Sequence, residues 1–277
     1  MMKKAKSESK SIDFLYGTAL GRFLLHPLVS PTVSMAAARF LSSKASAKIA
    51  VSFAEKNGIS LEDYEMPEGG YRSFNEFFTR KIKAGRREIS EGELIAPSDG
   101  LLTVAPITKD SVFSIKNTLY SLELLLRDRE LALKFEGGTA LIFRLTPAHY
   151  HRYSYCSSGE VKAKRRIDGV LHSVKPICHD NFPVFIENSR EYVVIENPVL
   201  GDIVQMEVGA LLVGKISNHP CEVGDSVEKG TEKGYFEYGG SSIVVLVGSD
   251  AGNRLGKEPT APDVEIPVLL GEELSVK

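Results

Sequence analysis

Residues 229–247 are the most informative part of the 277-residue chain, and they read Lys229-Gly-Thr-Glu-Lys-Gly-Tyr-Phe-Glu-Tyr-Gly-Gly-Ser-Ser-Ile-Val-Val-Leu-Val247. The run Ile243–Val247 is apolar and β-branched, and it predicts a strand directly after a Gly-Gly-Ser-Ser turn. Two glycines adopt backbone conformations closed to other residues, so the turn can present the Gly240 carbonyl to the Ser241 hydroxyl in a strained geometry. A flexible hairpin turn, with serine used only as a turn former, is the commoner interpretation of this segment by itself.

Short apolar runs alternate with Gly, Pro and Asp from Leu94 onward. They predict one helix near Ser121–Leu126 and strands over Leu101–Ala105, Ala140–Leu145, Tyr192–Ile195, Val204–Val208, Leu211–Ile216 and Ile243–Val247. The chain shows no strand–helix repeat of the dinucleotide-binding kind. The spacing therefore indicates a compact, mostly antiparallel β domain.

The first third of the chain has a helical pattern instead. Apolar residues spaced by three or four predict a helix within Val33–Asn57, with Gly58 as its stop. Ser73-Phe-Asn-Glu76 is a capping box, and it predicts a second helix that ends at Gly85 and has an apolar face of Phe74, Phe77, Phe78 and Ile82. The predicted fold is therefore α+β, with N-terminal helices over residues 1–90 followed by a β-rich domain over residues 91–277.

Composition narrows the class of protein. A net charge of −2 gives no support for nucleic-acid binding, and 43% hydrophobic with 25% charged residues argues against disorder. The longest apolar candidate, residues 14–33, is interrupted by Arg22, His26, Pro27 and Pro31, so no transmembrane helix is expected. The cysteines are too few for a disulfide framework and have no CxxC metal spacing; they are Cys156, Cys178 and Cys221.

Two histidines and an arginine follow the strand predicted over 140–145, in the order His149-Tyr-His151-Arg152. In an extended chain His149 and His151 point to one face and Arg152 to the other. This pattern favours an acid/base or carboxylate-binding site about as strongly as a structural role. Ala96-Pro-Ser-Asp99-Gly100 adds a carboxylate, although Asp-Gly is also an ordinary turn dipeptide.

Basic residues accompany the phenylalanines of the helix predicted from Ser73. They either hold this helix against an anionic membrane surface or form a solvated charged face, and they are Arg80, Lys81, Lys83, Arg86 and Arg87.

Together these segments resemble the phosphatidylserine decarboxylase family of pyruvoyl-dependent, self-processing proenzymes. The resemblance is weak in the N-terminal helices and is then carried, in the family's order, by Phe74-Asn-Glu-Phe-Phe-Thr-Arg80, Ala96-Pro-Ser-Asp-Gly100, Tyr150-His-Arg152, Gly201-Asp202, Met206-Glu-Val-Gly-Ala210, Val213-Gly214 and the Gly-Gly-Ser-Ser segment. Several separated motifs in one order are more specific than any one of them.

The resemblance implies that the Ser241 hydroxyl attacks the Gly240 carbonyl, cuts the chain between these two residues and leaves Ser241 as a pyruvoyl group. Asp99 matches the family's aspartate, which orients the base, and His151 matches a histidine expected near the substrate carboxylate. The implied substrate-binding residues are Arg152 and Ser242. Phosphatidylserine would become phosphatidylethanolamine and carbon dioxide through a Schiff base with the pyruvoyl group, without pyridoxal phosphate or a metal.

One position departs from the family's pattern. Many members carry a second histidine three residues after the first, which acts as the base for self-cleavage, and Ser154 stands there in this chain. The aspartate that usually precedes Tyr-His is replaced by His149. Serine cannot act as a base at neutral pH, so we expect His149 or His151 to take this role with Asp99. Slow or absent maturation is the other outcome.

The expected partners are the phospholipid substrate, a membrane surface, the two cleaved chains of the protein itself and, as one option, a second copy in a homodimer; nucleic acid is not expected. The expected location is peripheral, on the cytoplasmic side of the cell membrane, with residues 1–90 facing the membrane and residues 91–277 carrying catalysis. Two other functions stay open: the same pyruvoyl chemistry on a soluble amino acid, and a non-maturing, β-rich membrane-binding relative. A serine hydrolase is disfavoured because the GxSxG pattern is absent.

Overall fold

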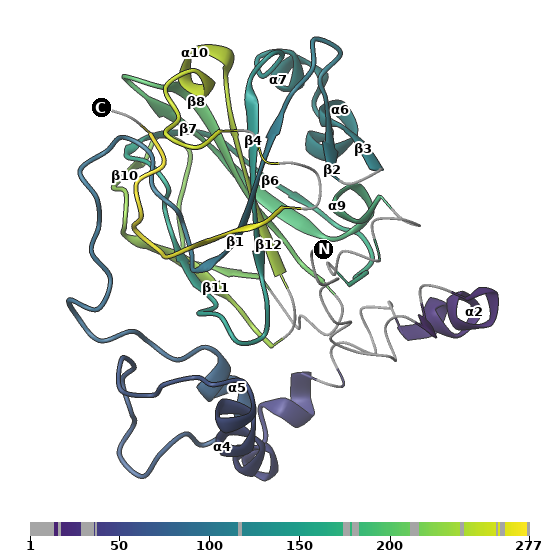
Figure 1. Cartoon of the computed structure of the whole chain (residues 1–277), viewed down its shortest axis with the longest axis vertical. Coiled ribbons are helices and arrows are strands. Elements are labelled where there is room, and N and C mark those ends of the chain that lie inside the picture. Colours follow the sequence, from purple (N-terminus) through teal and green to yellow (C-terminus); the bar gives the residue numbers. More distant parts are fainter. Residues whose placement is uncertain are drawn as a thin grey trace, which may run out of the picture.

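The computed structural model describes residues 14–15, 18–28, 36, 38–115, 118–173, 178, 183–210, 216–238, 241–258, 260 and 264–275. These residues form mostly antiparallel sheets with a few short helices, which agrees with the predicted α+β class (Figure 1).

An eight-stranded sheet forms the centre of the molecule, and every neighbouring pair of its strands is antiparallel. In spatial order the strands are β10 (Ser226–Val227), β6 (Gly159–Ile167), β7 (Arg190–Asn197), β8 (Gly201–Val208), β12 (Ser241–Val247), β4 (Thr139–Leu145), β1 (Gly100–Pro106) and β13 (Ile266–Val268). The strands predicted over 101–105, 140–145, 192–195, 204–208 and 243–247 are therefore confirmed.

Strand β12 lies in the middle of this sheet. All seven of its residues are buried, and it is paired with β4 on one side and β8 on the other. A β-branched apolar run suits this position, because both faces of the strand pack against protein.

A smaller sheet packs against one face of the large one. Its order is β5 (Arg152–Ser154), β11 (Glu232–Phe236) and β9 (Ile216–Asn218). Side chains of β8 join the two sheets, since Gln205 donates to the Ser154 carbonyl and Glu207 pairs with Lys233. The predicted strand over Leu211–Ile216 lies outside the described residues except for Ile216, which begins β9.

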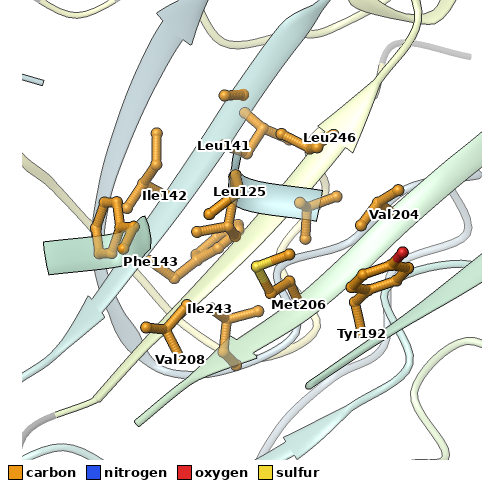
Figure 2. Close-up of a cluster of buried hydrophobic side chains, with 14 of the residues drawn as sticks. Leu125, Leu141, Ile142, Phe143, Tyr192, Val204, Met206, Val208, Ile243 and Leu246 are labelled. Carbon is orange, nitrogen blue, oxygen red and sulfur yellow. The ribbon is translucent and has the colours of Figure 1, made fainter. Parts of the chain in front are cut away.

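Short helices and a hairpin complete the β-rich part. They are the hairpin β2 (Val112–Ile115) and β3 (Thr118–Ser121), with α6 (Leu122–Leu126), α7 (Arg129–Leu133), α9 (Val184–Glu187) and α10 (Ser249–Gly252). Leu125 of α6 lies among side chains of β4, β8 and β12 in the main core (Figure 2). The helix predicted near 121–126 is thus confirmed as α6.

The N-terminal helices lie below the large sheet and to its lower right in the view of Figure 1, with α2 on the right. They are α2 (Ala19–Leu28), the 3-10 turn η1 (Lys44–Ser46), α4 (Ala47–Lys56) and α5 (Phe74–Phe78). Phenylalanines of α4 and α5 form their own core with Tyr238 from the chain after β11. None of the helices in the described ranges combines the length and apolarity needed to cross a bilayer.

The N-terminal predictions are partly wrong. The capping box is confirmed, since Ser73 caps α5 by accepting from the Glu76 amide, but α5 ends at Phe78 and not at Gly85. Thr79 caps this end: its backbone has left the helical conformation, with φ −91° and ψ 21°, and its hydroxyl bonds back to the Asn75 carbonyl. The predicted stop at Gly58 is confirmed: α4 ends at Lys56, and Gly58 has a φ of +65°. The domain boundary near residue 90 stays a prediction.

Candidate active site

The large sheet gathers the predicted site segments at one end of three adjacent strands. Arg144 of β4 pairs with Leu101 of β1 on one side and with Ser242 of β12 on the other. Asp99 immediately precedes β1, Ser241 opens β12, and the histidine segment follows the end of β4. Strand order therefore brings together residues that are far apart in the sequence.

Ser241 faces the smaller sheet. Side chains alternate along a strand and cross-strand partners share a face, so Ser241 shares its face with Ile243 and with Glu207, the partner of Ile243. Glu207 and Gln205 contact the smaller sheet from this face. The Ser241 side chain is fully buried, and its Oγ has no hydrogen-bond partner among the described residues. The next residue, Ser242, lies on the opposite face and is also buried.

His151 is buried against Phe78 of α5, with ring centroids 3.9 Å apart. Its Nδ1 lies 2.9 Å from the His149 carbonyl, which only accepts hydrogen bonds, so Nδ1 carries the proton of the neutral ring. Nε2 then holds the lone pair, and it has no partner among the described residues. Burial, followed by the charge of Arg80, holds the pKa of His151 well below its ordinary value. The ring is therefore a neutral base at neutral pH.

His149 is half-buried and bonded differently. Its Nδ1 accepts the Thr146 amide at 3.0 Å and lies 3.3 Å from the Thr146 hydroxyl. The lone pair on Nδ1 is engaged, and the proton of the neutral ring is on Nε2. Of the two histidines, the geometry thus favours His151 as the proton acceptor.

The Asp99 carboxylate is bonded to Arg87. Nε and Nη2 of Arg87 donate to its two oxygens at 2.9 and 2.6 Å, and the Leu270 amide donates at 2.9 Å. Asp99 is 5% exposed, so this is a well-buried, bidentate ion pair. Since His151 gives its Nδ1 proton to a backbone carbonyl, the structure does not bring Asp99 and the His151 ring into a hydrogen bond.

Two of the five basic residues predicted for a helix surface point into the protein instead. Arg87 reaches Asp99, and Arg80 is 2% exposed with its guanidinium 4.3 Å from the centre of the Tyr64 ring. The prediction is wrong for these two residues because α5 ends at Phe78, and the chain beyond it runs along the end of the β sheets.

A cavity of about 240 Å³ lies beside these groups. Its lining includes Arg87, Arg152 and Ser154, but not Ser241. Arg152 is held in place by bonds to the Thr79 carbonyl at 2.8 Å and to Glu232 at 2.7 Å.

Ser154 is buried, and its amide donates to the Pro97 carbonyl at 2.9 Å. The position where many family members carry a second histidine therefore adjoins the segment that carries Asp99.

Ser98 belongs to the same neighbourhood and was not predicted from the sequence. The described residues contain five buried side-chain atoms without a hydrogen-bond partner: Arg80 Nε, Ser98 Oγ, His151 Nε2, Ser241 Oγ and Ser242 Oγ. Each buried polar atom that is left unsatisfied costs about 1–3 kcal/mol, and native proteins contain few of them. The only sequence signal for Ser98 is its place next to Asp99.

A buried ion pair supports the strand that leads into the Gly-Gly-Ser-Ser segment. Lys233 of β11 lies 2.5 Å from Glu207 of β8, and both side chains are at most 2% exposed. Asn218 of β9 contacts both partners. Burial raises the pKa of Glu207, while Lys233 opposes this shift.

Two predictions remain, one on the cleavage residue and one on metal binding. Gly240, the predicted cleavage residue, lies outside the described residues. No group of three or more His, Cys, Asp or Glu side chains in the described part of the chain is placed to hold a metal ion.

Comparison with known proteins gives one consistent result. Residues 74–273 match the family model described as phosphatidylserine decarboxylase. Phosphatidylserine decarboxylase proenzyme 2 of Clostridium acetobutylicum is 44% identical, over 85% of this chain and 80% of its own length. The phosphatidylserine decarboxylase proenzyme of Ruminiclostridium cellulolyticum is 39% identical with the same coverage, and that of Clostridium novyi is 34% identical over 96% of this chain and 92% of its own length. With this extent of similarity, the chain belongs to the phosphatidylserine decarboxylase family.

Proposed function

We propose that the protein is a phosphatidylserine decarboxylase that cuts itself between Gly240 and Ser241 and uses the resulting pyruvoyl group to form phosphatidylethanolamine and carbon dioxide. The observation that carries this proposal is the state of Ser241 and His151. Each side chain is fully buried, and each presents an atom without a hydrogen-bond partner among the described residues. A nucleophile and a neutral base with spare hydrogen-bonding capacity are what activation of a serine requires.

In the self-cleavage step, the Ser241 Oγ attacks the carbonyl carbon of the preceding residue. The hydroxyl proton passes to Nε2 of His151, the C–N bond breaks and the freed nitrogen of Ser241 takes up the proton. The product is an ester between the two parts of the chain. By the family resemblance, elimination from this ester and hydrolysis with loss of ammonia then complete the pyruvoyl group.

His151 is the better candidate for the base because of the tautomers assigned above. Its Nδ1 proton is donated to the His149 carbonyl, so Nε2 is available to accept a proton. The Nδ1 lone pair of His149 already accepts the Thr146 amide. We therefore infer that His151 takes the role that Ser154 cannot perform.

A pyruvoyl group at position 241 fits its surroundings. Ser241 is paired with Leu145 of β4, and the neighbouring Ser242 is paired with Val208 of β8, so the start of β12 is fixed from both sides. When formed, the pyruvoyl group would supply an acceptor for the electron pair that the substrate keeps when its carboxylate leaves as carbon dioxide. The chain's own contribution is to bury this position and to hold His151 neutral at the same end of the large sheet.

The cavity beside Ser154 is the candidate entrance for the lipid headgroup. Its volume of about 240 Å³ is below the 300–1,000 Å³ typical of pockets that enclose a whole ligand, which suits a polar headgroup whose acyl chains stay outside. The ammonium group of Lys83 in its lining can attract the headgroup phosphate, whereas the charge of Arg152 is already paired with Glu232.

The N-terminal region provides a candidate membrane contact. On α2, Leu20 is 62% exposed, Phe23 77% and Leu24 46%. Large apolar side chains exposed on one short helix are typical of proteins that lie in a membrane interface. We infer a peripheral position on the cytoplasmic side of the cell membrane, with residues 1–90 forming the docking region.

Intact mass spectrometry of the purified protein tests the proposal. We expect two chains, of residues 1–240 and 241–277, with the second blocked at its amino terminus, and one uncut chain for Ser241→Ala. The His149→Phe variant should still cut, whereas His151→Phe should not. An uncut wild-type chain after prolonged incubation, together with no carbon dioxide release from phosphatidylserine liposomes, would refute the proposed function and favour a non-maturing relative.

A further inference from the structure

Arg80 is a buried cation without a carboxylate partner among the described residues. Its side chain is 2% exposed and packs on two aromatic rings, 4.3 Å from the centre of Tyr64 and 5.0 Å from that of Phe77. Buried charges in proteins are normally paired, because removing a charge from water costs several kcal/mol. An unpaired buried guanidinium next to a candidate active site therefore calls for a functional explanation.

The hydrogen bonds of Arg80 lead to the histidine segment. Nη2 donates to the carbonyls of Ala148 and His149, each at 3.3 Å, and Nη1 donates to the Phe77 carbonyl at 3.4 Å. The His149 carbonyl is the same atom that accepts the Nδ1 proton of His151 at 2.9 Å. Arg80 thus fixes the position of the acceptor that decides which nitrogen of His151 carries the proton.

The charge of Arg80 acts on the same ring. Among the described residues, the titratable groups whose charge acts on His151 are Arg80, from the segment after α5, and His149, from its own loop. The Phe78 ring, which packs against His151, carries no charge. A fixed cation near the ring disfavours a second positive charge on the imidazole, in the same direction as burial does.

We propose that Arg80 is the positioning residue of His151: it holds the His149 carbonyl, thereby selects the Nδ1–H tautomer, and keeps the ring unprotonated so that Nε2 can act as the base. This inference rests on the proposed role of His151 in self-cleavage. Arg80 thereby has a role inside the candidate site, whereas the sequence pattern indicated a role on the surface.

The test compares three variants of the full-length chain. Arg80→Met keeps the length of the side chain but removes its charge and its donors, and Arg80→Lys keeps the charge but loses the planar fork. Arg72→Met is the matched control, since Arg72 lies at the other end of α5 and its exposed side chain pairs with Glu76. Self-cleavage of freshly refolded precursor is followed by intact mass between pH 5 and 8.

The expected result is a displaced pH profile. Without the nearby cation the ring protonates more readily, so the acid limb of the Arg80→Met profile moves to higher pH; a move of one pH unit lowers the rate on that limb about tenfold. Arg80→Lys should keep the acid limb near its wild-type position but cut more slowly at every pH. Arg72→Met should match the wild type. A folded Arg80→Met protein with wild-type rates, or with the same fractional loss at every pH, would overturn the proposal.

A second measurement does not depend on cleavage. In the uncut Ser241→Ala protein, nitrogen-15 NMR of the His151 ring reports both the tautomer and the midpoint of its titration. We expect the Nδ1–H tautomer in the Arg80-containing protein and a higher titration midpoint in Arg80→Met. The opposite tautomer or an unchanged midpoint refutes the role of Arg80 even if cleavage occurs. If the NMR result is as expected but the wild-type chain never cuts, the proposed function fails while the role of Arg80 stands.

Discussion

We predict that removing either partner of the buried Lys233–Glu207 pair lowers the free energy of unfolding, and that the two losses depend on pH in opposite directions. Glu207→Leu leaves an ammonium group without its carboxylate in a place that is 2% exposed, and Lys233→Met leaves a fully buried carboxyl group. Loss of one partner of a buried pair typically costs about 3–5 kcal/mol of unfolding free energy, whereas replacing both by apolar groups is often neutral. We therefore expect two destabilised single variants and a double variant close to the wild type.

The cost of the two single changes should depend on pH with opposite signs. In Lys233→Met, the carboxyl group of Glu207, whose pKa burial already raises, keeps its proton in the folded state but loses it in the unfolded state above about pH 4.3. The folded state then binds more protons, so the destabilisation grows as the pH rises, by up to about 1.4 kcal/mol per pH unit. In Glu207→Leu the folded state sheds the proton of the lone ammonium more readily than the unfolded state, so the destabilisation shrinks as the pH rises.

Urea unfolding in the Ser241→Ala background measures these effects on a single uncut chain. The free energies of unfolding of the four proteins at about pH 6 and pH 8.5 form a double-mutant cycle, and contacting residues give coupling energies of about 0.5–3 kcal/mol. Lys134→Met is the control, because Lys134 pairs with Asp202 at the surface at 2.7 Å and such pairs contribute about 0–1 kcal/mol. Single variants that each lose less than about 1 kcal/mol, or that share one sign of pH dependence, would refute the reasoning.

Three further predictions concern single positions. Ser98→Ala removes a buried hydroxyl that has no partner among the described residues, so urea unfolding should give an unchanged or higher free energy of unfolding, by up to about 1 kcal/mol; a clear loss would mean that this hydroxyl is bonded. Gly138→Ala places a Cβ against the Val247 carbonyl oxygen, so the backbone must shift and we expect a loss of roughly 3 kcal/mol in the same assay, with a wild-type midpoint as the contradicting result. Acid should lower the free energy of unfolding of the Ser241→Ala protein below about pH 6.5, since only the unfolded state readily protonates His151, by up to about 1.4 kcal/mol per pH unit. His151→Phe should show a shallower fall, and coincident pH curves would count against the buried neutral imidazole.

The strands were predictable because their signal is local. Ile243–Val247 and Ala140–Leu145 are apolar, partly β-branched runs bounded by turn residues, and they form the adjacent strands β12 and β4. Strand β6 was not predicted, because its exposed basic side chains give it the composition of a solvated charged segment.

The site was predictable only where a motif carries it. Motifs and the paired histidines suggested Ser241, Asp99, His149 and His151 as candidate site residues, but the hydrogen-bond partners of these side chains depend on tertiary structure. Nothing in the sequence around Arg87 distinguishes an arginine that reaches Asp99 from one that faces solvent. The same holds for Arg80, whose burial follows from the early end of α5.

The central place of β12 in the large sheet has a consequence for how the protein would refold after the proposed cut. A cut before Ser241 leaves the 37-residue fragment with β12, which is bonded to β8 and β4, and with β13 at the sheet edge. In the proposed maturation this fragment could not leave without opening the sheet, so the two pieces would stay together in one folded protein. After denaturation the uncut precursor can refold at any dilution, whereas the matured protein must first reunite two separate molecules. The yield of refolded mature protein would therefore fall as the protein concentration is lowered. The yield of refolded precursor would not.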